Sequence, residues 1–221
     1  LGFEYEILTH LAEKLEVDLK IIIASTLPQA KEILKQGGAD VIAFGLAVNK
    51  QNKKSLSLTS ALYQTEQILA QKKPKEWKYM DRHKLEKELI RDLYDLEDKH
   101  NYTLKESAHT QRLKHISEEI GINIFIHEVN DSIHQEELLD MVIKGEIDYA
   151  ITDGNIARLY FNYNPEIDIK TPISFKQQIA FAVRQDSPEL LTEINKQLEK
   201  SQKKGTIRLF YRKYYSSSTW I

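Results

Sequence analysis

The sequence predicts an α/β protein with two similar lobes, because one pattern occurs twice along the chain. Residues 27–45 read LPQAKEILKQGGADVIAFG, and residues 135–154 read QEELLDMVIKGEIDYAITDG. In each copy a helical apolar pattern leads into Gly-x-x-Asp and a short apolar run, with Gly37 and Asp40 in the first copy and Gly145 and Asp148 in the second. A helix that ends at glycine and leads into a buried strand is half of a parallel βαβ unit. We therefore expect two α/β lobes that close on a ligand between them.

Composition excludes several classes of function. The chain has 221 residues, of which 41% are hydrophobic and 29% are charged, as in an ordinary globular protein. A net charge of -2 gives no electrostatic basis for binding nucleic acid. The absence of cysteine excludes disulfides, thiolate metal sites and cysteine nucleophiles. The longest apolar runs, such as 41–46 and 179–183, have the length of strands and not of membrane-spanning helices.

The first elements alternate between helix and strand. A first helix that ends near Val17 is indicated by apolar residues on one helical face: Phe3, Ile7, Leu11 and Leu15. After it we expect a strand at 19–24, a helix at 28–36, a strand at 40–44, a polar surface loop at 47–60 and an extended segment at 63–72. Because the chain begins inside a helix, we expect that further sequence precedes it in the parent protein, such as a signal peptide or lipid anchor and a first strand.

A highly charged stretch covers residues 73–98. Four leucines recur in it at helical spacing, at positions 85, 89, 93 and 96. The favoured interpretation is an exposed helix laid over one lobe, since charge runs usually mark a solvated face. A helix that binds a partner is the alternative.

The second half repeats the alternation. We expect strands at 101–104, 123–129, 149–152, 168–170 and 177–183, and helices at 109–119, 135–144, 155–161, from 191 onward and at 207–215. The extended segments 63–72 and 177–183 flank the middle of the chain and predict a two-strand hinge. Lobe one would then comprise residues 1–70 and 178–221, and lobe two residues 71–177.

Four segments together resemble the family 3 extracellular solute-binding proteins. They are GFEYEIL near the start, GGADVIAFGLAVNKQNKK, KGEIDYAITDGNIA, and the terminal IAFAVRQDSPELLTEINKQLEKSQKKGTIRLFYRKYY. Within this family the sequence is most similar to the solute-binding domain of membrane-bound lytic murein transglycosylase F, over nearly the whole chain but without the first strand. The resemblance implies a type II periplasmic-binding-protein fold that traps an amino acid or a similar small solute.

The resemblance also places ligand-binding residues in lobe one. Amino-acid-binding members carry Gly-x-Thr-x-Thr-x-x-Arg, whose arginine takes the ligand carboxylate as a bidentate partner. The matching positions here, taken with the residue after the glycine, are Gly45, Leu46, Ala47, Asn49 and Asn52. Both threonines and the arginine are therefore replaced. The lysines at 50, 53 and 54 are interpreted as solvated loop residues.

In lobe two the family pattern is a strand, then Lys-Gly-Ser-Ser/Thr at the start of a helix whose free amides bind the same carboxylate. The matching residues are Ser107, Ala108 and His109, with Glu106 in place of glycine. For Ser107 a helix-capping role is favoured. Asp153 matches the residue that takes the ligand's amino group, and an N-cap role for it is equally expected. His109 is a candidate pH-sensitive residue of the cleft.

These replacements predict a change of ligand class. A cation is lost and an anion is gained, and a unit charge at 4 Å is worth about 4 kcal/mol at an effective dielectric constant of 20. We therefore expect a neutral or cationic solute, such as an amine, an amino-acid-like molecule or a cell-wall fragment, or a degenerate regulatory domain. An ordinary α-amino acid held in the family manner is not expected.

Three functions remain open at this stage. The first is a non-catalytic solute-binding domain in the periplasm, free for an ABC permease or anchored to the outer membrane. The second is a regulatory domain of a lytic murein transglycosylase whose catalytic domain lies outside this chain. The third, an enzyme on the same fold, is disfavoured by the missing arginine. The histidines, six of which fall within 83–134, show no metal-ligand spacing, so no metal and no cofactor are expected.

Overall fold

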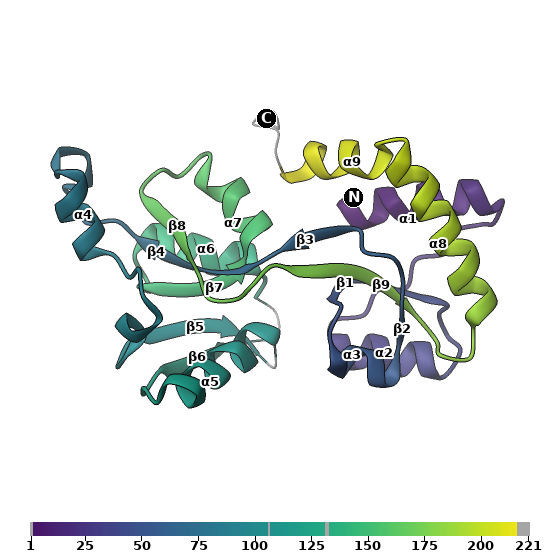
Figure 1. Cartoon of the computed structure of the whole chain (residues 1–221), viewed down its shortest axis with the longest axis horizontal. Coiled ribbons are helices and arrows are strands. Elements are labelled where there is room, and N and C mark those ends of the chain that lie inside the picture. Colours follow the sequence, from purple (N-terminus) through teal and green to yellow (C-terminus); the bar gives the residue numbers. More distant parts are fainter. Residues whose placement is uncertain (1, 106, 131–132, 216–221) are drawn as a thin grey trace. The chain divides into compact units, whose positions relative to one another are not determined.

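A computed structural model describes residues 2–105, 107–130 and 133–215 (Figure 1). The chain forms two compact units, one from Leu1–Gln64 with Gln177–Ile221 and one from Thr65–Lys176. The chain thus passes from one unit to the other at 64/65 and returns at 176/177. Residues 65–70 belong by their contacts to the second unit, whereas the sequence pattern placed them in the first lobe.

The first unit is built around strand β9. Its helices are α1 (Phe3–Leu15), α2 (Leu27–Lys35), α3 (Lys50–Ser55), α8 (Pro188–Lys203) and α9 (Thr206–Tyr215), and its strands are β1 (Val41–Ala47), β2 (Ser57–Leu58), β3 (Tyr63–Thr65) and β9 (Gln177–Val183). Strand β9 pairs with each of the other three, and its pairing with β1 and β2 is antiparallel. Helices α1, α8 and α9 gather on one side of β1 and β9, and α2 and α3 lie on the other (Figure 1).

Two apolar clusters hold this arrangement. Phe3, Ile7 and Leu11 of α1 pack against Phe181 and Val183 of β9, together with residues of α8 and α9. On the other side α2 packs on β1 in a second, smaller cluster. The sheet is therefore covered on both faces, which explains why β9 reads as a continuous apolar run.

The predicted strand at 19–24 is wrong. The segment is coil, and no strand of the described residues pairs with it. Its large apolar side chains are exposed, Ile23 to 88% and Ile21 and Ile22 to more than 40%. The β-branched composition favours a strand, but a strand forms only where a neighbour satisfies its backbone groups. The parallel βαβ unit expected here is consequently absent from the described part of the first unit.

The predicted surface loop at 47–60 contains a short helix, α3, and the two-residue strand β2. The N-terminus of α3 is capped by Asn49, whose side chain accepts a hydrogen bond of 2.8 Å from the Asn52 amide. The lysines that suggested a loop lie on the exposed side of this helix. Polar composition alone did not reveal the cap, which supplies the start signal of the helix.

The second unit contains a five-stranded mixed sheet. Its strands are β4 (Gln67–Lys72), β5 (His100–Leu104), β6 (Phe125–Val129), β7 (Tyr149–Asp153) and β8 (Ile167–Pro172), and its main helices are α5 (Ala108–Ile120), α6 (Gln135–Lys144) and α7 (Gly154–Phe161). The strand order is β6-β5-β7-β4-β8, in which β5 runs parallel to β6 and β7. Helix α5 covers one face, and α6 and α7 cover the other (Figure 1).

The repeated pattern forms a glycine-terminated helix in both units. Helix α2 is followed by Gly37 with a φ of 75°, and α6 by Gly145 with a φ of 76°. This left-handed conformation is available to glycine without steric cost, and it ends each helix before the next strand. The predicted glycine-terminated helix is confirmed in both copies, with the bounds of α6 as predicted, but among the described residues the parallel strand pairing occurs only in the second copy, since β1 pairs antiparallel with β9.

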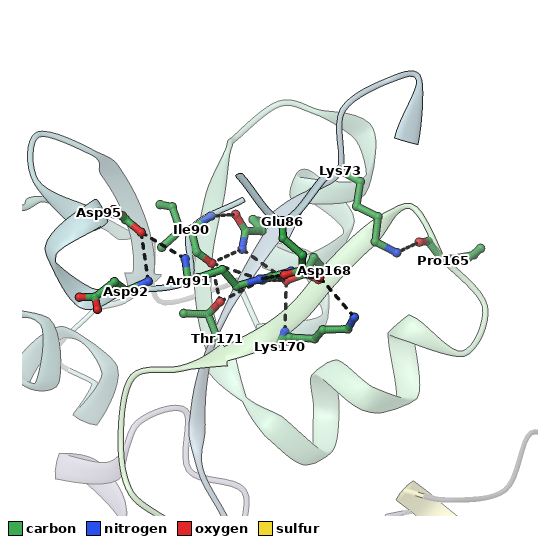
Figure 2. A network of polar contacts seen from close by, with 11 residues as sticks. Lys73, Glu86, Ile90, Arg91, Asp92, Asp95, Pro165, Asp168, Lys170 and Thr171 are labelled. Carbon is green, nitrogen blue, oxygen red and sulfur yellow. Dashed lines mark hydrogen bonds and ion pairs between the residues drawn. The ribbon is translucent and has the colours of Figure 1, made fainter. Parts of the chain in front are cut away.

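The predicted helix over 73–98 is replaced by three short pieces, η1 (Trp77–Tyr79), α4 (Arg82–Glu88) and η2 (Leu93–Leu96). Figure 2 shows how the end of this excursion is attached to the sheet. Arg91 forms a bidentate pair with the buried Asp168, at 2.6 and 2.9 Å. The Gln71 side chain pairs with both backbone groups of Ile90, at 2.9 and 3.0 Å. These polar contacts, together with Ile90 and Leu96 in the apolar cluster beneath α5, hold the segment in place of a continuous helix face.

In the described ranges, no helix combines the length and the apolar character needed to cross a bilayer.

Candidate functional site

The last part of β1, which leads into the first-unit candidates, is shaped by Gly45. This residue has a φ of 66°, and the register between β1 and β9 shifts between Ile42 and Leu46, on either side of it. A side chain on Gly45 would meet Ile179 at 3.3 Å. Leu46 points into the core and is 5% exposed, so only its backbone is available to a ligand. Glycine is therefore required at this irregularity of β1, after which pairing with β9 resumes at Leu46 and Ala47.

The next three candidates, Ala47, Asn49 and Asn52, hold one another. Asn52 is buried, and its side-chain amide donates to the Ala47 carbonyl at 2.9 Å. The backbone amide of Asn49 donates to the same carbonyl at 3.0 Å. Asn49 in turn caps α3, because its side-chain oxygen accepts a hydrogen bond from the backbone N–H of Asn52. The side chains at the second threonine position and at the arginine position thus stabilise the loop itself.

A cation that the sequence pattern did not reveal lies beside Asn52. The Lys31 ammonium of α2 donates to the Asn52 side-chain oxygen at 3.3 Å. Lysine provides a single point charge, in contrast to the planar fork of arginine. The contact joins residues 21 positions apart, so no local spacing in the sequence could have indicated it. Lys50, Lys53 and Lys54 are exposed, as expected.

The second-unit candidates lie at the carboxyl edge of the parallel strands. Ser107 caps α5, accepting a hydrogen bond of 3.2 Å from the Thr110 amide, which confirms its predicted capping role. Ala108 is exposed at the first turn, where backbone amides have no acceptor within the helix. Glu106, which replaces the family's glycine, lies outside the described residues.

Asp153 is held by two side chains from neighbouring helices. Its Oδ1 lies 3.1 Å from Nε2 of His109, and its Oδ2 accepts a hydrogen bond of 2.9 Å from the Gln135 amide. The Asp153 backbone amide donates to Gln135 Oε1 at 2.7 Å. Asp153 occupies the N-cap position of α7, but its side chain does not cap that helix. The carboxylate is instead directed to His109 and Gln135, and its side chain is still 33% exposed.

These contacts set the protonation of the site. Burial by itself would raise the pKa of Asp153, but the neighbouring His109 and the hydrogen bonds from His109 and Gln135 lower it below its ordinary value of 3.8. An ionised carboxylate only accepts hydrogen bonds, so Nε2 of His109 carries the proton of this contact. His109 is 5% exposed, and its Nδ1 is buried with no hydrogen-bond partner among the described residues.

The three contributing elements meet for a topological reason. His109 follows β5, Gln135 begins the helix after β6, and Asp153 ends β7. Since β5 is parallel to both β6 and β7, their carboxyl ends share one edge of the sheet, where α/β proteins commonly bind ligands. Gln135 was not among the predicted site residues, although the start of a helix in a predicted βαβ unit could have indicated it. Among the residues described, no group of three or more His, Cys, Asp or Glu side chains is arranged to hold a metal ion.

Comparison with known proteins agrees with this geometry. Residues 1–217 match the family model described as bacterial extracellular solute-binding proteins, family 3. Among curated proteins, the chain is 31% identical over 223 residues to membrane-bound lytic murein transglycosylase F of Pseudomonas fluorescens, covering 97% of the chain and 42% of that protein. The corresponding protein of Desulfosudis oleivorans is 26% identical, with 98% and 44% covered. The chain thus spans less than half the length of these relatives.

Solved structures of amino-acid-binding proteins share the fold. An ancestral arginine-binding protein bound to arginine superposes with a TM-score of 0.78 at 25% identity, covering 98% of this chain and 88% of that one. A mutant of the arginine-binding protein of T. maritima gives 0.79 at 20% identity, with 98% and 86% covered. The GluR0 ligand-binding core complex with L-glutamate gives 0.79 at 13% identity, with 98% and 90% covered. The fold is that of the type II periplasmic binding proteins.

Proposed function

We propose that this chain, which belongs to the bacterial extracellular solute-binding proteins of family 3, binds a neutral or cationic small solute and not an α-amino acid held in the family manner. One observation carries the proposal. Asn52, at the position of the carboxylate-binding arginine, is buried, and both ends of its amide are engaged, by Ala47 and by Lys31. A bidentate cationic partner for a ligand carboxylate is therefore missing from this position.

Lys31 does not restore the lost contact. Its ammonium is directed at the Asn52 oxygen, and a lysine cannot present two parallel donors to one carboxylate. In the first unit, an α-amino acid would find only a point charge for its carboxylate. The binding free energy available to that group is correspondingly smaller than in the arginine-containing members.

The second unit favours a ligand that donates hydrogen bonds. Asp153 is ionised, and its side chain is 33% exposed. A ligand hydroxyl, amide or ammonium group can therefore donate a hydrogen bond to this carboxylate. Amines and the amide- and hydroxyl-rich fragments of the cell wall carry such groups. We propose Asp153 and His109 as the principal solute contacts of this unit.

Calorimetric titration against a panel of solutes tests the proposal. The panel comprises common α-amino acids, polyamines and soluble muropeptides, and each titration is repeated with Asp153→Asn. We expect tight binding only among the amines or muropeptides, and weaker binding in the variant. Tight binding of glutamate or aspartate by the wild-type chain would overturn the proposal.

A second function is favoured by the curated relatives. Because the chain covers about 42% of the lytic transglycosylases that it matches, we propose that it can also serve as the regulatory domain of such an enzyme in the bacterial cell envelope. The reading frame that encodes the chain decides this alternative. A downstream helical domain with a catalytic glutamate would support it, whereas a stop codon directly after Ile221 would overturn it.

A further inference from the structure

Two histidines form a close pair on the sheet of the second unit, away from the carboxyl ends of the strands where Asp153 lies. His100 is the first residue of β5 and His127 is the third residue of β6, the edge strand. Nδ1 of His100 lies 2.7 Å from Nε2 of His127. His100 is exposed and His127 is half-buried, so both rings can be reached from solvent. Neither residue belongs to the solute contacts proposed above.

Aromatic neighbours on the same face fix the two rings. Phe125 stacks on His100 with ring centroids 4.7 Å apart, and Tyr102 stacks on His127 at the same distance. The two imidazoles are themselves inclined by only 16°. The strand register explains this order, because His100 lies opposite Phe125 and Tyr102 lies opposite His127. Each imidazole is thus packed against an aromatic ring from the neighbouring strand, and two of their nitrogens face one another.

We propose that His100 and His127 form a binding site for a late first-row divalent transition-metal ion such as Cu²⁺, Ni²⁺ or Zn²⁺. Imidazole nitrogens suit these ions, whereas Mg²⁺ and Ca²⁺ require oxygen ligands. An ion bound at about 2.0–2.1 Å from each nitrogen requires the two rings to turn so that both lone pairs converge on it, because the nitrogens face one another at 2.7 Å. Two protein ligands leave the remaining coordination positions to water, so the site is open.

The protonation change balances. In the metal-free pair one facing nitrogen carries a proton that it donates to the other. Metal binding requires a lone pair on both facing nitrogens, so this proton leaves and the opposite nitrogen of the same ring takes one up from solvent. The two neutral imidazoles then bind the ion with no net release of protons. The bound ion connects the edge strand β6 to β5.

Titration of the whole chain, first freed of metal with a chelator, tests the proposal. Calorimetry with ZnCl₂, NiCl₂ and CuCl₂ should show saturable binding of one ion per chain. His100→Gln and His127→Gln should each lower the affinity at least tenfold. His115→Gln, which removes an exposed histidine of α5 outside the pair, should leave the affinity unchanged. Unaltered binding in both pair variants, or no saturable binding in the wild type, would overturn the proposal.

A spectroscopic measurement on the wild-type chain tests the site without depending on whether the variants fold. The ¹⁵N chemical shifts of the wild-type imidazoles, recorded with and without Zn²⁺, should identify Nδ1 of His100 and Nε2 of His127 as the coordinated atoms. Amide hydrogen exchange in β6 should slow at least several-fold when Zn²⁺ is added. Coordination shifts at other histidines, or exchange in β6 that does not respond to the ion, would contradict the assignment.

Discussion

Nε2 of His109 and Oδ1 of Asp153 lie 3.1 Å apart at the carboxyl edge of three parallel strands, and this contact decides how the second unit presents its acidic group. Nε2 of the histidine donates a hydrogen bond to the carboxylate, and its Nδ1 is buried without a hydrogen-bond partner among the described residues. The pair therefore presents a partly exposed carboxylate at this edge of the sheet. Gln135 fixes the same carboxylate from the other side.

Substitution of the acidic group should weaken solute binding. In Asp153→Asn the charge is removed while the size of the side chain is kept, so the affinity for the bound amine or muropeptide should fall at least tenfold, about 1.4 kcal/mol. Asp148→Asn removes an exposed carboxylate just before the same strand and serves as the control. Calorimetry of both variants checks this expectation. Equal losses of affinity in the two variants would argue against a specific role for Asp153.

Stability should depend on pH through the same group. The pKa of Asp153 is lower in the folded chain than its ordinary value of 3.8, so its contribution is fully present above that value and is lost as the pH falls through the folded pKa. Asp153→Asn should therefore lose less stability than the wild type between pH 6 and pH 3. Urea denaturation at a series of pH values measures the difference. Identical pH profiles would show that the carboxylate is not stabilised by His109 and Gln135.

The pair formed by Arg91 and Asp168 should be important for stability. Asp168 has a side chain that is 2% exposed, and Arg91→Ala would leave this carboxylate buried without its bidentate partner. Loss of one partner of a buried pair costs about 3 kcal/mol, measurable by chemical denaturation. The exposed pair between Lys196 and Glu193 provides a control, since Lys196→Ala should cost less than about 1 kcal/mol. Comparable small effects in both variants would refute this assignment.

The end of α2 should be sensitive to backbone conformation alone. Gly37 has a φ of 75°, and nothing lies within 4 Å of the place that a Cβ would take, so Gly37→Ala adds conformational strain without a clash. We expect a loss of about 1 kcal/mol in the free energy of unfolding. Gly37→Asn should lose less, because asparagine tolerates the left-handed conformation better. A destabilisation by alanine that is no larger than that by asparagine would contradict this explanation.

Elements with local start and stop signals could be predicted from sequence. The helix at 135–144 was located to the residue because its apolar spacing leads directly into Gly145. The strand at 19–24 was wrong because strand formation depends on a neighbour, which local composition does not contain. The prediction of one helix at 73–98 was wrong for a related reason. Arg91 and Gln71 attach this segment to the sheet through contacts between residues far apart in the sequence.

The candidate site also contains some residues that the sequence could indicate and others that only the structure could. The positions of Asn52 and Asp153 follow from the family pattern, but the commitment of the Asn52 amide to Ala47 depends on the fold of the loop. Lys31 and Gln135 could be assigned to the candidate site only from their side-chain contacts with residues far apart in the sequence. The sequence could thus predict a change of binding chemistry at position 52, whereas the contacts of Asn52 with Ala47 and Lys31 could be found only in the structure.

We propose that the replacement of the family's arginine by Asn52 removes the carboxylate-binding function from this position. One calorimetric comparison tests this proposal. It measures the affinity of the wild-type chain and of Asn52→Arg for one α-amino acid panel that includes arginine, glutamine and glutamate. We predict no tight binding by the wild type, and at least a tenfold gain for one of these ligands in the variant. Tight binding of any of the three by the wild-type chain would contradict the proposed loss.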